Sequence, residues 1–290
     1  MSVADVRLEE PKPVIEADVT PKTLARRGLD MLLAIAPPFA VFAVVIGGWY
    51  VATYVVLDPQ RRFLLPPPHT VVSESFFHHT ARTEIFTAAW ATARVAALGL
   101  FIATVLGIVT AIAMSQARWV ERSLFPWAVV LQTIPILAIV PLIGFWFGFD
   151  FRSRVLVCVL ISLFPMITST LFGLRSAPQG LHDVFSTRRA NRWIRLLKLE
   201  FPTALPAIFV GLRTCAGLSV IGAIVGDFFF RQGNPGIGRL IDNYRAELFS
   251  AQLFGAIVVS SLMGIVAFAV VGWVGERVVG SWHETGRHRR

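Results

Sequence analysis

The sequence predicts an all-α polytopic membrane protein, and three properties of the chain support this fold class. Of the 290 residues, 55% are hydrophobic and only 16% are charged. The mean hydropathy is +0.65, which lies above the range of soluble globular domains. Apolar runs long enough to cross a hydrocarbon core of about 30 Å, which takes roughly 20 helical residues, recur along the chain. Because lipid offers no hydrogen bonds, each run is expected to be helical.

Six of these runs are expected to cross the membrane. They cover residues 32–57, 93–114, 124–147, 155–174, 204–229 and 253–279. Small residues repeat every four positions in the second and fifth runs, a spacing that lets neighbouring helices approach closely in lipid. Pro135 and Pro141 are expected to kink the third run. Thr70, which follows Pro66, Pro67 and Pro68, is expected to cap a short interfacial helix through Val71, Phe76 and Phe77 between the first two runs.

The distribution of Lys and Arg predicts the orientation. Sixteen of them lie in the terminal segments and in the even-numbered connections, and eight lie in the odd-numbered ones. Cytoplasmic segments carry the excess of positive charge. We therefore expect both termini and the 175–202 loop to be cytoplasmic, in a multi-pass protein of the inner (plasma) membrane. We also expect a flexible tail over 1–30, a transmembrane domain over 31–282 and a basic tail over 283–290.

Composition argues against several kinds of site. The net charge of +9 is spread over short segments between apolar runs, which disfavours nucleic-acid binding. Cys158 and Cys215 lie inside apolar runs and are expected to be packing residues. His69, His78 and His79 do not match the spacing of metal ligands, so no metal is expected. No lysine follows a glycine in a phosphate-binding pattern, so we expect no nucleotide or other cofactor in this chain.

The 175–202 loop is too polar to be inserted and is patterned as two short helices. The first begins after Pro178 and runs to about Thr187, and the second covers 191–200. Trp193, Ile194 and Leu197 share an apolar side of the second helix. Phe201 and Pro202 are expected to end it.

At this loop the chain resembles the permeases of binding-protein-dependent ATP-binding-cassette importers. The resemblance rests on Asp183-Val184-Phe185, Arg192-Trp193, the run from Phe201 to Pro206, and Gly211-Leu212-Arg213. Further matching segments include Leu65 to Pro68, Thr133 to Gly148 and Gly236 to Gly238. Together they are similar to the branch that handles nitrate, sulfonates, taurine and pyrimidine precursors. The resemblance implies a six-helix bundle like that of type I importers.

The resemblance also implies partners and roles. ATP and Mg²⁺ would be bound by a separate ATPase subunit, so this chain would not be an enzyme. A second permease copy, most simply in a homodimer, an extracytoplasmic substrate-binding protein and membrane lipid would complete the assembly. The loop residues implied in coupling to the ATPase are Asp183, Val184, Phe185, Arg188, Arg189, Ala190, Arg192 and Trp193.

Two loop positions depart from the family pattern. Asp183-Val184-Phe185 stands where a Glu-Ala-Ala triplet is expected, and Arg189 stands where a glycine is expected. Either the ATPase carries a compensating acidic surface or the coupling is weakened. We favour the acidic surface, because Arg188, Arg189 and Arg192 would pair with it.

Gly211, Arg213 and Asp227 are the candidates for the pathway or a gate. Gly211 would be a close-packing or hinge position. Arg213, deep in its run, either faces the pathway or makes an interhelical contact. Asp227 either braces a loop or gate or is solvated at the outer edge of the membrane.

Two alternatives from other classes remain. An ion-coupled secondary transporter usually has acids or a broken-helix ion site near the midplane, and no such acid appears. An intramembrane enzyme needs paired acids or histidine-rich motifs within spans, and none is found. The residues do not identify the transported solute.

Overall fold

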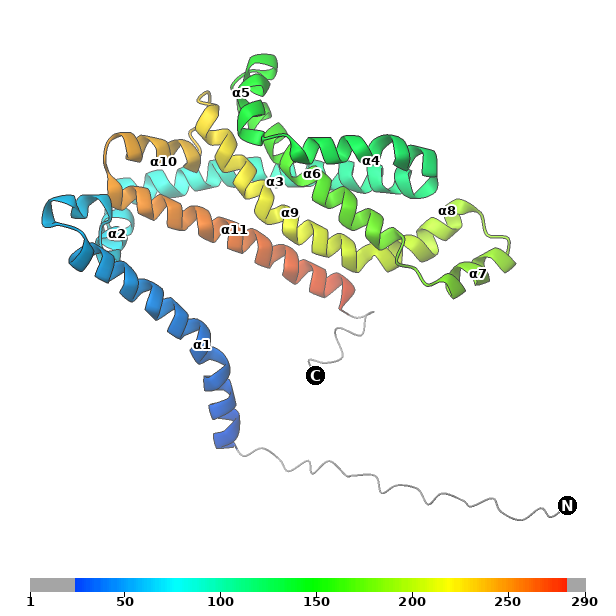
Figure 1. Cartoon of the computed structure of the whole chain (residues 1–290), viewed down its shortest axis with the longest axis horizontal. Coiled ribbons are helices and arrows are strands. Elements are labelled where there is room, and N and C mark those ends of the chain that lie inside the picture. Colours follow the sequence, from blue (N-terminus) through cyan, green and yellow to red (C-terminus); the bar gives the residue numbers. More distant parts are fainter. Residues whose placement is uncertain (1–23, 281–290) are drawn as a thin grey trace, which may run out of the picture.

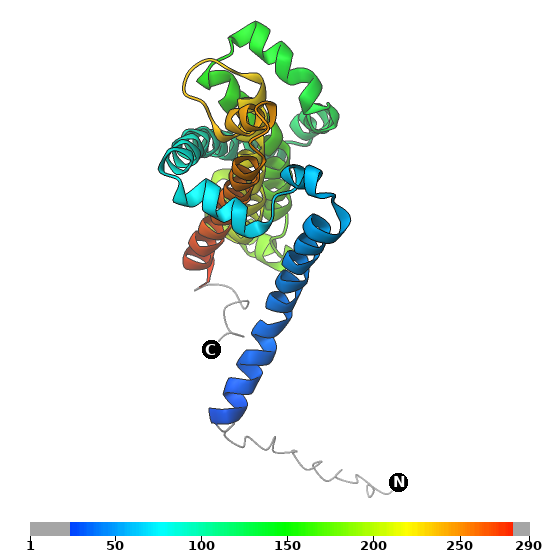
Figure 2. The same cartoon turned by 90° about the vertical axis from the view of Figure 1, so that its left-hand side faces the viewer.

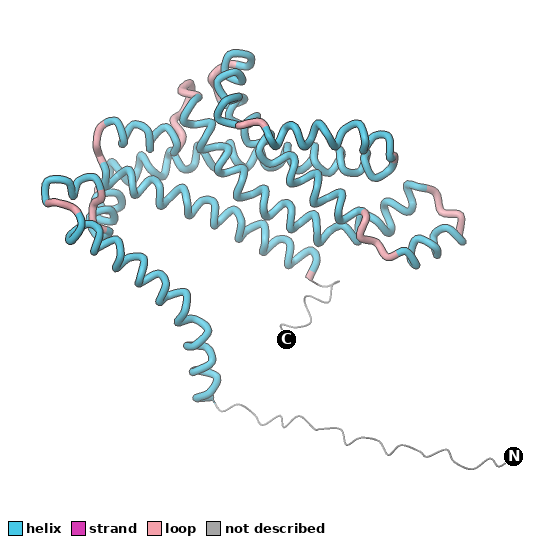
Figure 3. The backbone as a smooth tube through the Cα atoms, viewed as in Figure 1, coloured by secondary structure: helices cyan, strands magenta, loops and turns pink. Residues whose placement is uncertain are grey.

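The computed structural model describes residues 24–280 of the chain, with side chains from residue 36 onward, and this part is helical without strands (Figures 1 and 3). The long helices are α1 (Leu24–Val51), α3 (His79–Gln116), α6 (Phe151–Leu174), α9 (Phe201–Phe229) and α11 (Ser250–Val279). The shorter ones are α2 (Pro68–Val72), α4 (Arg118–Thr133), α5 (Ile136–Phe147), α7 (Gln179–Thr187), α8 (Arg192–Arg195) and α10 (Ile237–Ala246). Single π turns follow α1, α2 and α8, and a 3-10 turn covers Pro59–Leu64.

Five described helices are long and apolar enough to span a membrane, and the bent pair α4 and α5 makes a sixth candidate. The predicted all-α polytopic architecture is confirmed. The chain passes back and forth between two ends of the bundle. α7 and α8 lie at one, which we call the loop end, and α2 and α10 lie at the other, which we call the opposite end (Figure 1).

Small residues bring the central helices together. A Cβ built on Gly99 of α3 would lie 2.3 Å from the Cβ of Cys158 on α6. A Cβ built on Gly222 of α9 would lie 2.9 Å from the Cα of the same Cys158. Cys158 is fully buried between these helices, and Cys215 is fully buried as well. The expectation that the small-residue stripes and both cysteines serve packing is confirmed.

The third predicted span is two helices rather than one kinked helix. α4 ends at Thr133 and α5 begins at Ile136, with an angle of 101° between them. Ile134 is extended, with φ −67° and ψ 126°, as the residue before a proline prefers. The bend at Pro135 is therefore confirmed, but Pro141 lies inside α5 without interrupting it.

Three other helix starts differ from those expected from the sequence. α3 begins at His79, 14 residues before residue 93, because no helix breaker separates the polar start from the apolar run. α1 begins at Leu24, inside the expected tail, whereas residues 1–23 and the predicted 283–290 tail lie outside the described part. Thr70 lies within α2, which is capped by Pro67.

The connection from the loop into α9 also differs from the expectation. Helical backbone continues from α8 through a π turn at Leu196–Glu200 into α9, so Phe201 and Pro202 do not end the second loop helix. The Phe201 amide bonds the carbonyl of Leu196, five residues back. This wider turn accommodates Pro202, which lacks an amide proton and sits in the first turn of α9.

α1 stands apart from the other helices for most of its length (Figures 1 and 2). Its C-terminal end is attached to the opposite end of the bundle. The Nε1 of Trp49 donates to the carbonyl of Pro66 at 3.1 Å, and its ring lies 5.3 Å from that of Phe254 on α11. Phe39, Phe42 and Val44, which precede Trp49 on α1, are exposed.

Candidate functional site

α7 presents an exposed surface at the loop end and finishes in a defined turn. Asp183 and Val184 are exposed, and Phe185 is half-buried. The amide of Arg189 bonds the carbonyl of Ser186, and the amide of Ala190 bonds that of Phe185, each at 3.0 Å. These two bonds form a Schellman motif, which ends a helix with a left-handed residue, usually glycine.

Arg189 is that left-handed residue, with φ of +51°. A side chain in this conformation costs about 1–2 kcal/mol relative to right-handed backbone. A glycine, which the resemblance leads one to expect at this position, would adopt this conformation without that cost. The loop keeps its turn while presenting an additional cation.

Asn191 caps the start of α8, because its Oδ1 accepts a hydrogen bond from the amide of Ile194 at 2.8 Å. Leu196 and Leu199 form the buried side of the following turn. Trp193, Ile194 and Leu197 face outward instead, and Trp193 is 63% exposed. A hydrogen bond of 3.2 Å from Arg195 to the Oγ of Ser186 connects α8 to α7.

The loop surface thus combines exposed apolar side chains with cations. The cations are Arg188, Arg189, Arg192 and Lys198, all of them exposed. The eight predicted coupling residues lie within α7, α8 and the short connection between them, which carries Arg188, Arg189 and Ala190. Exposed aromatic and Arg side chains in one patch are typical of protein interaction surfaces.

Asp227 forms a buried network at the opposite end. Its carboxylate accepts from Thr92 Oγ1 on α3 at 2.6 Å and from Arg154 Nη1 on α6 at 3.2 Å, and also from the amide of Gly238. Thr92 Oγ1 accepts in turn from the amide of Ile237 at 2.8 Å. Asp227 is 0% exposed, so the alternative that it is solvated at the membrane edge is wrong.

Arg154 holds the connection between α9 and α10. It donates to the carbonyl of Asn234 at 2.9 Å and to that of Gln232. Sequence reasoning did not select Arg154. The sequence contained a signal for this pair. Arg154 comes just before the predicted span 155–174, and Asp227 lies near the end of the predicted span 204–229. Because these two spans are antiparallel, both residues fall at the same face of the membrane.

A second bond anchors α10 on α3. The hydroxyl of Tyr244 donates to Glu84 Oε2 at 2.8 Å. Burial, and then this hydrogen bond, raise the pKa of Tyr244, so it remains a neutral donor at physiological pH.

Gly211 and Arg213 contact different helices. A Cβ built on Gly211 would lie 2.5 Å from the Cβ of Ser169, which makes it a close-packing position against α6. The guanidinium carbon of Arg213 lies 4.0 Å from the ring centroid of Phe268 on α11, a cation–π contact. The three pathway candidates Gly211, Arg213 and Asp227 are therefore not brought together.

A cavity of about 440 Å³ opens instead at the bend between α4 and α5. α6 and α9 contribute Leu160, Pro165 and Leu218 to its walls, and none of the three pathway candidates lines it. Gln132 is the single polar residue among those lining it. Within residues 24–280, no group of three or more His, Cys, Asp or Glu residues is arranged to hold a metal ion.

Comparison with known proteins agrees with this architecture. Among solved structures, an amino acid ABC transporter crystallised with histidines has the same fold, with a TM-score of 0.56 at 13% identity, covering 70% of this chain and 98% of that one. The formylaminopyrimidine transport permease ThiX of Halalkalibacterium halodurans is 31% identical over 234 residues, which cover 81% of this chain and 91% of that protein.

Two further relatives belong to the same branch. The putative aliphatic sulfonates permease SsuC of Escherichia coli is 30% identical, covering 81% of this chain and 88% of that protein. The nitrate import permease NrtB of Leptolyngbya laminosa is 28% identical, covering 63% and 65%. Residues 103–280 match the family model of the binding-protein-dependent transport system inner membrane component. The chain belongs to this family and is a multi-pass permease subunit of an ATP-binding-cassette importer, of the branch that includes nitrate, sulfonate and pyrimidine-precursor permeases.

Proposed function

We propose that α7 and α8 dock into a separate ATPase subunit, which binds ATP and Mg²⁺ and drives the permease between outward and inward openings. The observation that carries this proposal is the exposure of Trp193 and Leu197 together with four exposed cations, over α8, its connection to α7 and the π turn that follows it. α8 continues through one π turn into α9. Because the helical backbone is continuous, a movement of α8 would be transmitted directly to α9.

The charge of the loop supports a partner with an acidic groove. Of the predicted coupling residues, Arg188, Arg189 and Arg192 are exposed and make no side-chain hydrogen bond or ion pair within the described chain. An acidic partner surface would pair with them and would offset the cost of the left-handed Arg189. This supports the compensating-surface interpretation over weakened coupling.

The proposed orientation places the loop end and both termini in the cytoplasm. Counting α4 and α5 as one broken span gives six crossings within residues 24–280, which returns the C-terminal end of α11 to the loop end. The extracytoplasmic substrate-binding protein would then meet the opposite end. The exposed apolar side chains of α1 fit contact with lipid and with a second copy of the permease in a homodimer.

The cavity at the bend between α4 and α5 is the proposed part of the solute pathway. It lies against the centres of α6 and α9, and an interrupted helix beside a cavity is a common way to build a passage in a membrane. Gln132 would offer an amide hydrogen bond to the passing solute. Gly211 and Asp227 would act as packing and bracing residues, and Arg213 would connect α9 to α11.

The proposed substrate is a small solute of the nitrate, sulfonate, taurine or pyrimidine-precursor type. The support comes from the relatives, whose names refer to formylaminopyrimidine, aliphatic sulfonates and nitrate. An ion-coupled secondary transporter and an intramembrane enzyme do not agree with membership of this family.

ATP hydrolysis by the purified permease–ATPase complex tests the docking proposal. Trp193→Ala and Arg189→Glu should each lower permease-stimulated hydrolysis about tenfold or more, because truncating an interface anchor typically costs at least 2 kcal/mol. Trp90→Ala and Arg82→Glu are the matched controls. Trp90 is 66% exposed, and both residues lie in the N-terminal part of α3, at the opposite end of the bundle. Hydrolysis unaffected by the loop variants would show that α7 and α8 do not couple.

A further inference from the structure

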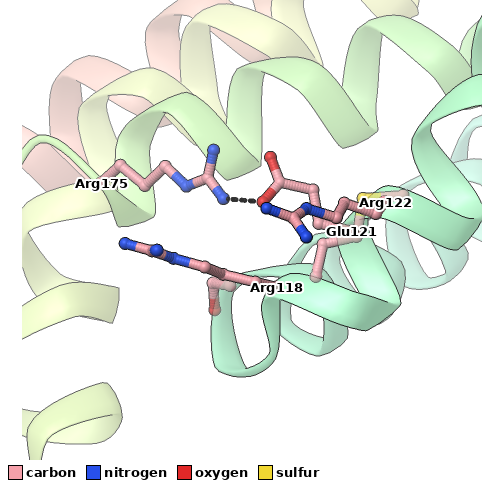
Figure 4. A pocket seen from close by; sticks show the side chains of 6 residues that line it. Arg118, Glu121, Arg122 and Arg175 are labelled. Atoms are coloured by element: carbon pink, nitrogen blue, oxygen red, sulfur yellow. Dashed lines mark hydrogen bonds and ion pairs between the residues drawn. The ribbon is translucent and has the colours of Figure 1, made fainter.

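A basic pocket of about 580 Å³ lies at the loop end, outside the proposed coupling surface and pathway (Figure 4). Arg118 and Arg122 come from the first turns of α4, and Arg175 follows the last residue of α6. Met114 and Ser115 of α3 complete the lining together with Glu121. Three guanidinium groups, two from α4 and one from the residue that follows α6, therefore surround one space together with a single carboxylate.

Two of the three arginines have no partner in the described part of the chain. Glu121 Oε2 accepts from Arg175 Nη2 at 2.5 Å, which engages the single acid of the pocket. Arg118 and Arg122 are exposed and make no hydrogen bond or ion pair among residues 24–280. Their side chains lie one helical turn apart on the same face of α4. The lining carries a net charge of about +2, so an anion would complete it.

The neighbouring surface identifies where that anion would come from. Trp119, next to Arg118, is 72% exposed, and Trp127 two turns farther along α4 is also exposed. Tryptophan side chains are enriched at the level of lipid headgroups. Basic pockets between membrane helices on the cytoplasmic side bind the phosphate groups of lipids.

We propose that the pocket formed by Arg118, Arg122 and Arg175 binds a phosphate-bearing anion, supplied by the headgroup of an anionic phospholipid. The volume suits a glycerophosphate headgroup, because ligand pockets commonly measure about 300–1,000 Å³. A bound phosphate would bridge α4 to Arg175, the first residue of the loop that leads to α7. Anionic lipid would thereby brace the base of the coupling loop.

Lipid retention by the full-length permease, purified in a neutral detergent and measured by native mass spectrometry, tests the proposal. The wild-type chain should retain phosphatidylglycerol in preference to phosphatidylcholine. Arg118→Gln/Arg122→Gln should weaken this retention about thirty-fold, from about a factor of five for each arginine near an anionic surface. Glu121→Gln should strengthen it, because Arg175 is then released to the anion.

The matched control is Arg61→Gln/Arg82→Gln, which removes two exposed arginines at the opposite end and should leave retention unchanged. Equal retention in the Arg118→Gln/Arg122→Gln variant and in the wild type, or an equal loss in the control, would overturn the site. Thermal unfolding of each variant checks that the fold is intact, and we expect little change in Tm because all four substituted arginines are exposed.

Inorganic phosphate distinguishes the source of the anion. If phosphate stabilises the wild-type chain and phosphatidylglycerol does not, the site stands but the lipid assignment is overturned. If phosphatidylglycerol binds and phosphate does not displace it, the lipid assignment is supported. The cytoplasmic location of the pocket rests on the proposed function, whereas lipid binding measured in detergent does not. Absence of lipid binding would therefore overturn this site and leave the proposed ATPase coupling unaffected.

Discussion

Arg154 on α6 and Asp227 on α9 form a 3.2 Å ion pair whose two side chains are 3% and 0% exposed. Each member has further partners, since Thr92 and Gly238 donate to Asp227 and Arg154 donates to two carbonyls of the connection between α9 and α10. A buried pair is tolerated when most of its remaining hydrogen-bonding groups are satisfied, and of the groups of this pair only Arg154 Nε lacks a partner in the described part of the chain. The network therefore fixes four helices (α3, α6, α9 and α10) and the connection between α9 and α10 in a single arrangement.

Removing one member of this pair should destabilise the bundle strongly. Asp227→Ala leaves the Arg154 charge buried without a partner, and the expected loss is about 3–5 kcal/mol. The free energy of unfolding in detergent, measured by steric trapping, checks this. Arg231→Gln is the matched control, because it breaks an ion pair with Asp242 whose arginine is 66% exposed, and the expected loss is at most about 1 kcal/mol. Equal losses in the two variants would contradict the role of burial.

Gly236→Ala should disrupt the same network from the side of the backbone. A Cβ at this position would lie 1.9 Å from Oδ2 of Asp227, so either the carboxylate or the start of α10 must move. We expect a loss of several kcal/mol, comparable to that of Asp227→Ala. Gly217→Ala on α9 is the control, because its Cβ would meet nothing within 4 Å. A Gly236→Ala protein as stable as Gly217→Ala would show that the contact is not tight.

Arg189→Gly should stabilise the end of α7 and distinguish the two interpretations of this position. Removing the left-handed side chain is expected to gain about 1 kcal/mol, measured as slower hydrogen exchange of the Ala190 amide. Leu248→Gly should gain the same amount, because Leu248 has φ of +61° and ends α10 in the same way, far from the loop.

ATP hydrolysis by the complex then separates the interpretations. If Arg189 pairs with an acidic partner surface, Arg189→Gly lowers permease-stimulated hydrolysis while Leu248→Gly does not. If the arginine weakens coupling, Arg189→Gly raises it. Faster exchange of the Ala190 amide in Arg189→Gly would contradict the assignment of the Schellman turn itself.

Gln132→Leu should impair transport without impairing ATP hydrolysis. The substitution makes the lining of the 440 Å³ cavity wholly apolar, and losing one hydrogen bond to the solute is expected to weaken uptake about two- to tenfold. Uptake into vesicles containing the complete importer, measured with the solute that its binding protein carries, checks this. Gln60→Leu, at an exposed glutamine in the 3-10 turn outside the cavity, is the control. Unchanged uptake in Gln132→Leu would place the pathway elsewhere.

Hydropathy and helix chemistry in the sequence were enough to predict the spans and the two loop helices, because lipid requires apolar helices and Pro178 marks the start of α7. Hydropathy did not predict the start of α3 at His79, since a helix continues past the apolar run wherever its residues favour helix. The sequence predicted a kink at Pro135, but the helix is interrupted and the two parts meet at 101°. The reason is that a proline also favours extended backbone at the residue before it, here Ile134.

The site residues were predictable only in part. The coupling candidates Asp183, Arg189 and Trp193 follow from a local sequence pattern, and their coupling role stays a prediction. Arg154 and Asp227 are 73 residues apart in sequence, and their pairing depends on how α6 and α9 pack. The left-handed backbone of Arg189 was also invisible, because an arginine gives no sign of a conformation that glycine usually adopts.

Site-specific photo-crosslinking tests most directly whether α7 and α8 contact the ATPase subunit. Both native cysteines are fully buried, so a cysteine introduced at an exposed position is the reactive thiol for benzophenone maleimide. With Val184→Cys on α7, which is exposed, we predict a crosslinked product of the permease and its ATPase subunit, and none with Trp90→Cys at the opposite end. No ATPase product from Val184→Cys, or equal products from both positions, would contradict the proposed coupling surface.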